Sequence, residues 1–75
     1  MKLKENIDMI AFMDKTKQCH GDIYFHTSEG DSLNLKSTLC QLIMATLLSS
    51  PKLLYSGEII CTEDADYNTL QDFTK

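Results

Sequence analysis

The chain has 75 residues, of which 43% are hydrophobic, and seven Lys and Arg against eleven Asp and Glu give a formal net charge of −4. This length suits one domain with a small core, so we expect a single domain over residues 1–75. The negative charge disfavours binding to nucleic acid and to anionic membranes. The sequence also contains no run of about 18 apolar residues, the length needed to span a bilayer. Nucleic acid and membrane are therefore excluded as expected partners.

The three cysteines, Cys19, Cys40 and Cys61, are odd in number and widely spaced. A disulfide framework in a short secreted domain would favour an even number. No hydrophobic signal-peptide region precedes a small-residue cleavage site. We therefore expect reduced thiols and a cytoplasmic location.

The first predicted elements are a short edge strand over residues 1–5, in which Leu3 is apolar, and a helix over residues 7–18. The helix has a face of apolar residues and Thr16 at spacings of three and four, and Asn6 is a plausible N-cap. Gly21 is a natural stop. The residues expected to be buried are Met9, Phe12, Met13 and Thr16.

After Gly21 the apolar residues recur at every second position, which predicts the strands of a β-hairpin. Residues 22–27 form the first strand, with Ile23, Phe25 and Thr27 on one face and Tyr24 and His26 on the other. The turn chemistry of residues 28–31 includes Gly30, which tolerates a positive φ. Residues 32–35 form the second strand.

A second helix is predicted from Ser37 to the Ser49-Ser50-Pro51 stop, because Pro51 cannot extend a helix. Helical spacing favours one apolar face formed by Leu39, Leu42, Ile43 and Thr46 or Leu47. Residues 52–56 form a connector with some helical character, and residues 57–62 a strand with Ile59 and Cys61 on one face and Ile60 on the other.

A last helix begins near Thr62 or Asp64, with Tyr67, Leu70 and Phe73 on its buried side. The carboxylates near its start favour the helix dipole and solubility; they belong to Glu63, Asp64 and Asp66. The element order is β-α-β-β-α-β-α. An antiparallel sheet with its helices on one face would bury all the apolar stripes together, which is an α+β fold.

The junction Asn34-Leu35-Lys36-Ser37, between strand and helix, resembles that of the HPr family, the histidine-containing phosphocarriers of the bacterial sugar phosphotransferase system. The element order is also similar. Thr16-Lys17-Gln18 followed by Gly21-Asp22-Ile23 resembles the passage from the first helix to the second strand, and Glu58-Ile59-Ile60-Cys61 the fourth strand. The resemblance covers nearly the whole chain. It implies an open-faced sandwich with a four-stranded sheet of order 1-4-2-3.

In the HPr family, a histidine at the start of the first helix accepts a phosphoryl group from enzyme I. The corresponding place here is about Glu5-Asn6-Ile7, which has no histidine, arginine or proline. The resemblance therefore implies a degenerate member that does not relay phosphate. We expect a regulatory or protein-binding module related to the phosphotransferase system, with a cytoplasmic protein as its partner and no cofactor.

Ser37 matches the serine that a dedicated kinase phosphorylates in the family, and a phosphate is electrostatically favourable at a helix N-terminus. We favour the simpler interpretation that Ser37 is an N-cap whose hydroxyl accepts a backbone N–H, which stabilises a helix by about 1 kcal/mol. The resemblance also suggests partner-surface residues beside Ser37, although a lone apolar Leu39 is more typical of a core. These candidates are Lys36, Thr38, Leu39 and Leu42.

Two alternatives remain open: a genuine phosphocarrier that uses His20 or His26, and an oligomer formed through Leu53-Leu54-Tyr55. The Cys19, His20, His26 and Cys61 spacings match no zinc signature, so we expect no metal site. No phosphate-binding loop, nucleophile elbow or metalloprotease motif is present. We therefore expect that the protein is not an enzyme and that it acts at most as a phosphate acceptor.

Overall fold

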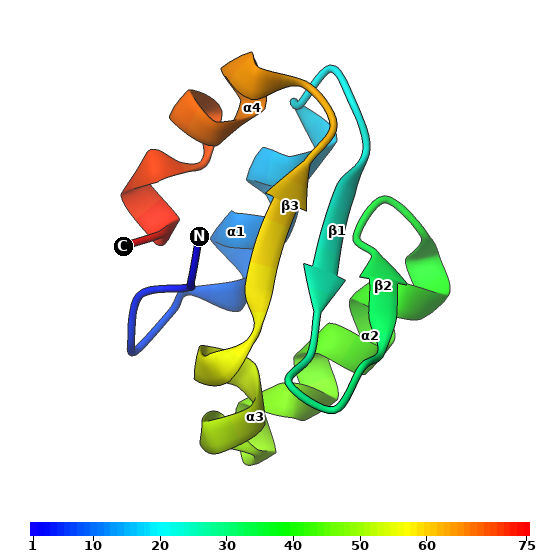
Figure 1. Ribbon diagram of the computed structural model, residues 1–75, viewed down its shortest axis with the longest axis vertical. Coiled ribbons are helices and arrows are strands. Elements are labelled where there is room, and N and C mark those ends of the chain that lie inside the picture. Colours follow the sequence, from blue (N-terminus) through cyan, green and yellow to red (C-terminus); the bar gives the residue numbers. More distant parts are fainter.

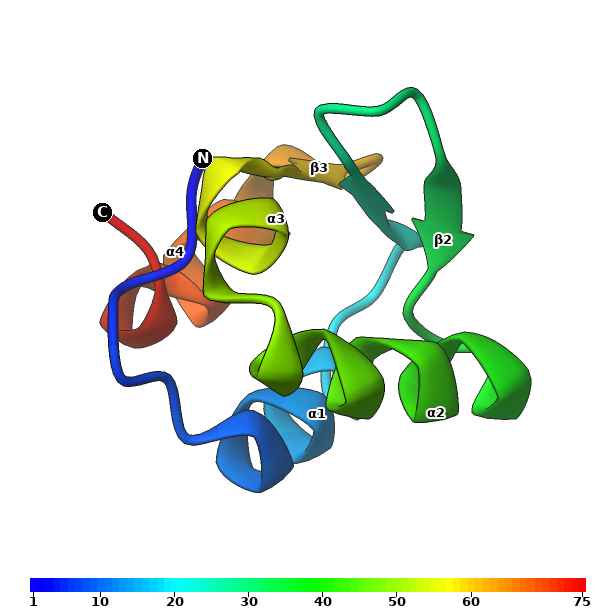
Figure 2. The same ribbon diagram turned by 90° about the horizontal axis from the view of Figure 1, so that it is seen from below.

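Four α-helices and three strands, with two short 3-10 turns, form an α+β fold that the computed structural model describes over residues 1–75 (Figure 1). All four helices lie on one side of the sheet, and the other face of the sheet is open (Figure 2). None of the helices has the length and apolar character that crossing a membrane requires. In chain order the elements are α1 (Met9–Lys17), β1 (Ile23–His26), β2 (Ser32–Asn34), α2 (Thr38–Thr46), η1 (Leu47–Ser49), α3 (Pro51–Ser56), β3 (Glu58–Cys61), α4 (Asp64–Thr69) and η2 (Gln71–Phe73).

The sheet is antiparallel, in the order β2-β1-β3. The register pairs Ile23 with Cys61 and Phe25 with Ile59. All four of these side chains are buried, as the period of two predicts for both strands. The centre of the core therefore lies beneath β1 and β3.

The predicted hairpin is present between β1 and β2. Phe25 pairs with Leu33, and Gly30 in the connecting turn adopts a φ of 96°. This left-handed conformation is the reason for a glycine in the turn. Leu35, just after β2, is fully buried, and its N–H donates to the carbonyl of Ile23 at 2.8 Å.

Helix α1 buries the predicted stripe of Met9, Phe12, Met13 and Thr16. The ring of Phe12 meets the ring of Phe73 edge to face, with 5.7 Å between centroids, which joins α1 to the C-terminal turn. The predicted N-cap was wrong. Asp8 caps the helix, and its carboxylate accepts a hydrogen bond from the N–H of Ala11 at 3.1 Å, whereas Asn6 lies in the preceding turn with a φ of 60°.

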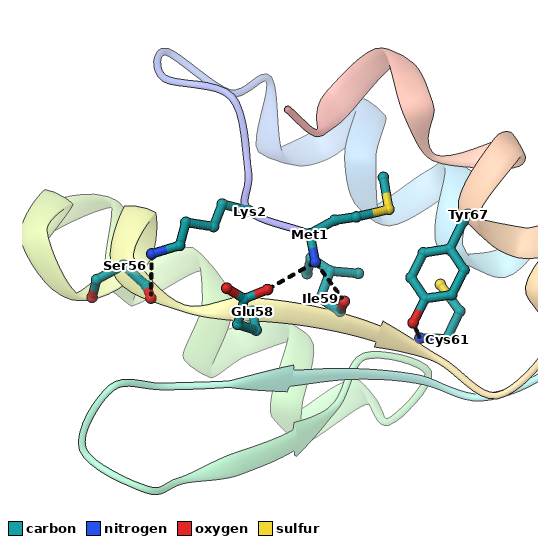
Figure 3. Close-up of polar contacts among 7 residues, drawn as sticks. All are labelled: Met1, Lys2, Ser56, Glu58, Ile59, Cys61 and Tyr67. Carbon is teal, nitrogen blue, oxygen red and sulfur yellow. Dashed lines mark hydrogen bonds and ion pairs between the residues drawn. The ribbon is translucent and has the colours of Figure 1, made fainter.

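The predicted edge strand over residues 1–5 does not form, so the four-stranded sheet is not confirmed. Leu3 makes one isolated bridge to Thr74, and the N–H of Lys4 donates to the carbonyl of Phe73 at 2.9 Å. These contacts take the segment away from the sheet toward the C-terminus. Only Met1 lies beside β3, where its ammonium group contacts Glu58 at 2.8 Å and the carbonyl of Ile59 at 3.3 Å (Figure 3).

The predicted connector after Pro51 is a helical turn, α3, with Pro51 at its start, where the missing N–H costs little. Its side chains divide between the core and the surface. Leu54 is fully buried, and Leu53 and Tyr55 are half-buried. The Leu53-Leu54-Tyr55 run therefore offers less free surface for self-association than its sequence suggests.

Candidate functional site

The most exposed apolar side chains of the helical layer, apart from Ile10 of α1, lie on α2. Leu39 is 67% exposed and Leu42 is 63% exposed, and Ile43 on the same face is 37% exposed. We call these three residues the α2 outer stripe. The spacing had predicted this face as the buried one, and that prediction was wrong, because the only fully buried side chain of α2 is Met44.

The segment of sequence that contains the α2 outer stripe lacks charged residues. No charged residue occurs from Ser37 to Pro51, and no acidic residue from Ser32 to Gly57. Lys36 and Lys52 flank this uncharged run, in a chain whose net charge is −4. An apolar surface without charges costs little to desolvate, which is a property of the centre of protein interfaces.

The candidates around the start of α2 have different surroundings. Lys36 and Thr38 are exposed, but the ammonium group of Lys36 donates to the carbonyl of Cys19 at 2.7 Å. Lys36 therefore also has a structural role, because it holds the end of α1 against the start of α2.

Ser37 stands at the N-cap position of α2 with an extended φ of −81° and ψ of 130°. Its side chain makes no capping hydrogen bond, so the predicted N-cap contact is absent. Instead, the side-chain amide of Gln41 donates to the carbonyl of Leu35 at 3.0 Å and ties the first turn of the helix to the residue that follows β2. The exposed hydroxyl of Ser37 is thus not engaged at the helix start.

The start of α1, where the resemblance would place the phosphorylated histidine, borders an open groove of about 720 Å³. Two of its lining residues are joined by a hydrogen bond, in which the N–H of Ile7 donates to the Tyr55 hydroxyl at 3.2 Å. Neither a histidine nor a cysteine lines it, so the groove offers no nucleophile of those types. Its lining is Glu5, Asn6, Ile7, Leu48, Pro51, Lys52 and Tyr55.

Both histidines are exposed and lie away from this groove. His20 follows the opposite end of α1, and its backbone N–H donates to the carboxylate of Asp66 at 2.9 Å. His26 projects from β1 and pairs in register with Glu58 of β3. Neither imidazole takes part in these contacts: the bond of His20 comes from its backbone, and the carboxylate of Glu58 pairs with the ammonium group of Met1.

Asp66 is a fully buried carboxylate that sequence reasoning had assigned to the helix dipole and to solubility. It accepts hydrogen bonds from the N–H groups of Gly21, at 2.8 Å, and His20, at 2.9 Å. These two bonds lower the pKa of Asp66, and the bond from Gly21 has the larger effect. Asp66 is a structural residue that fixes the turn after α1.

The cysteines are all free thiols, and no three His, Cys, Asp or Glu side chains gather as a metal site would require. Cys19 and Cys61 are buried, and burial raises the pKa of both thiols, that of Cys61 to about 11. Because the thiolate is the reactive form, these two residues are poor nucleophiles and metal ligands at neutral pH. Cys40 is partly exposed on α2.

Comparisons of the chain with protein-family models, curated proteins and solved structures gave no match. The case for a function therefore rests on the chain itself. Its most distinctive surface is the α2 outer stripe.

Proposed function

We propose that this protein is a degenerate HPr-like module that binds a cytoplasmic protein through the α2 outer stripe and does not relay phosphate. The observation that carries the proposal is the exposure of Leu39 and Leu42, 67% and 63%, on a helix without a charged residue. Large exposed apolar side chains that gather on one face mark interaction sites more often than scattered ones do. Thr38 and Lys36 would border the contact.

The strand order adds support for the HPr-like part of the proposal. The order β2-β1-β3 is the one that a 1-4-2-3 sheet would have for its second, third and fourth strands. Met1 beside β3 occupies the side where the first strand would lie. The resemblance of the Asn34-Leu35-Lys36-Ser37 junction is the other support.

Two features argue against phosphorelay. Asp8 already provides a fixed carboxylate at the start of α1, so an added phosphoryl group would meet a like charge there. His20 and His26 are exposed, and no hydrogen bond joins a positive side chain to either imidazole. A phosphoryl group on either histidine would lack the compensating charge that such an anion requires.

Intact mass tests the phosphorelay part. The chain is incubated with phosphoenolpyruvate and enzyme I, and separately with ATP and the HPr serine kinase. We expect no acid-labile adduct in the first reaction, and an adduct on His20 or His26 would overturn this part. An adduct on Ser37 in the second would make the module kinase-controlled, with the new charge placed beside the α2 outer stripe.

Affinity capture tests the binding part. The immobilised wild-type chain and the double variant Leu39→Glu/Leu42→Glu are compared in extracts of the source cell. Ile60→Glu is the matched control, because Ile60 is exposed on the open face of the sheet. We expect a saturable partner that wild type and control retain and the double variant loses; equal retention by all three would contradict the proposed surface.

A further inference from the structure

A second hollow lies between the hairpin and the helical layer, with a volume of about 320 Å³. Ligand pockets begin at about this size. The hairpin that contains β2 lies on the sheet side, and α2 lies in the helical layer (Figure 2). The lining residues are Thr27, Asp31, Ser32, Leu33, Ile43, Leu47 and Leu53.

The orientation of α2 explains why this cavity exists. Because α2 buries Met44, its neighbouring residue Ile43 stays 37% exposed and Leu47 is half-buried. Leu33 of β2 and Leu53 of α3 are half-buried as well. The four aliphatic side chains therefore line the cavity without filling it.

The rim of the cavity is polar and carries one charge. The N–H of Asp31 donates to the Thr27 hydroxyl at 3.0 Å, and that hydroxyl donates to the Asp31 carboxylate at 3.4 Å. The N–H of Thr27 also donates to the carbonyl of Asp31 at 2.9 Å. These three bonds hold Asp31 in place at the edge of the aliphatic wall.

No positive side chain of the protein compensates Asp31. The three ion pairs of the structure involve Glu58, Asp14 and Glu5, and none of them includes Asp31. Lys52 borders a separate hollow together with Glu29 and does not line this cavity. The lining thus combines an aliphatic wall with one exposed carboxylate that no ion pair of the protein neutralises.

We propose that this cavity binds small aliphatic amines. The alkyl chain would contact Leu33, Ile43, Leu47 and Leu53, and the ammonium group would pair with the carboxylate of Asp31. The aliphatic wall provides affinity through burial of apolar surface, and the carboxylate provides selection by charge. Ile43 belongs both to this cavity and to the α2 outer stripe, but the proposal does not require a protein partner.

The test is a titration of the whole chain with hexylamine, hexanol and hexanoate, which share one alkyl chain and differ in the head group. Methyl signals of the lining residues in NMR spectra report binding. We expect saturable binding of hexylamine with a Kd on the order of millimolar. Hexanol binds about threefold to tenfold more weakly, because it lacks the charge that pairs with Asp31. Hexanoate does not saturate the site.

Variants separate the two parts of the proposal. Asp31→Asn weakens hexylamine binding by about threefold to tenfold and leaves hexanol binding unchanged. Glu29→Gln, in the same turn but outside the lining, leaves both unchanged. Leu47→Phe fills the cavity and removes binding of both, and Leu53→Phe is the second filling variant should Leu47→Phe not fold, as its denaturation curve will show.

Other results would overturn the proposal. Absence of saturable binding by hexylamine would remove the site. Equal affinities for hexylamine and hexanol, or an unchanged hexylamine affinity in Asp31→Asn, would show that the carboxylate of Asp31 does not contribute to binding. If the shifted signals belong to residues outside the lining, the amine binds elsewhere. The same conclusion follows if both filling variants show the same shifts as wild type.

Discussion

The carboxylate of Asp66 accepts a hydrogen bond from the N–H of Gly21 at 2.8 Å, across 45 residues of sequence. This contact joins α4 to the turn that leads from α1 into β1. The N–H of His20 donates to the same carboxylate at 2.9 Å. The two backbone donors stabilise the anionic form of this buried carboxylate, and the bonds couple α4 to the rest of the fold.

We predict that Asp66→Asn lowers the midpoint of chemical denaturation at pH 7, because the amide keeps one acceptor oxygen and places its NH2 group against one of the two backbone donors. Asp64→Asn is the control, since Asp64 is exposed on the same helix. The pKa of Asp66 is lowered by folding, so its contribution is present above the unfolded pKa of about 3.9 and is lost as pH falls through the lower folded pKa.

Denaturation curves measured from neutral to strongly acidic pH check this direction of the pH dependence of stability. The wild type should lose stability toward acid, and Asp66→Asn should lose less over the same range. An acid dependence that is identical in Asp66→Asn and wild type would show that Asp66 is not the group responsible.

The orientation of α2 gives a second prediction. Met44→Ala should destabilise the protein by about 2–5 kcal/mol, because Met44 is fully buried. Leu39→Ala should change the free energy of unfolding by no more than about 0.5 kcal/mol, because Leu39 is 67% exposed. Urea denaturation measures both, and a larger loss for Leu39→Ala than for Met44→Ala would mean that α2 buries its other face.

Gly57 gives a third prediction. A Cβ at this position would lie 2.2 Å from Cζ and 2.5 Å from Cε1 of Phe25, a buried ring of the core. We expect Gly57→Ala to lower stability by about 1–3 kcal/mol through this overlap. Gly30→Asn is the glycine control, because nothing lies within 4 Å of an added Cβ and the substitution therefore tests the backbone strain at a φ of 96° without any overlap. Equal effects of the two substitutions in thermal denaturation would contradict this packing.

The thiols give a fourth prediction. At pH 8, a pKa of about 11 leaves about a thousandth of Cys61 as thiolate, and Cys19 is also buried with a raised pKa. Cys40 should therefore alkylate at least about tenfold faster than either. Mass spectrometry of the native chain should show one fast site, which Cys40→Ser removes. Fast labelling of two or three sites would contradict the burial of Cys19 and Cys61.

Much of the fold could be predicted from the sequence wherever polar and apolar residues alternate clearly. The stripe from Met9 to Thr16 and the alternation at Ile23 and Phe25 each admit one buried face, and the structure buries it. In α2 apolar residues occur on several sides, including Leu42 and Met44, so periodicity cannot choose the buried side. Tertiary packing makes that choice.

The polar contacts could be predicted less well than the core. The partners of Asp66 are backbone groups 45 and 46 residues away, and a backbone N–H leaves no sign in a sequence. Similarly, the N-cap rule suits Asn6, Asp8 and Ser37 alike, and only Asp8 makes the capping bond. The candidate surface at Leu39 and Leu42 was identified by resemblance, and its exposure became evident only in three dimensions.

Site-specific photo-crosslinking in the source cell tests the central claim, binding through the α2 outer stripe, most directly. A photoreactive phenylalanine replaces Leu42, and a matched one replaces Tyr24 on the open face of the sheet. We predict one discrete protein adduct from position 42 that is absent from position 24 and is lost when Leu39→Glu is added. Adducts of equal yield from both positions, or none from position 42, would contradict the claim.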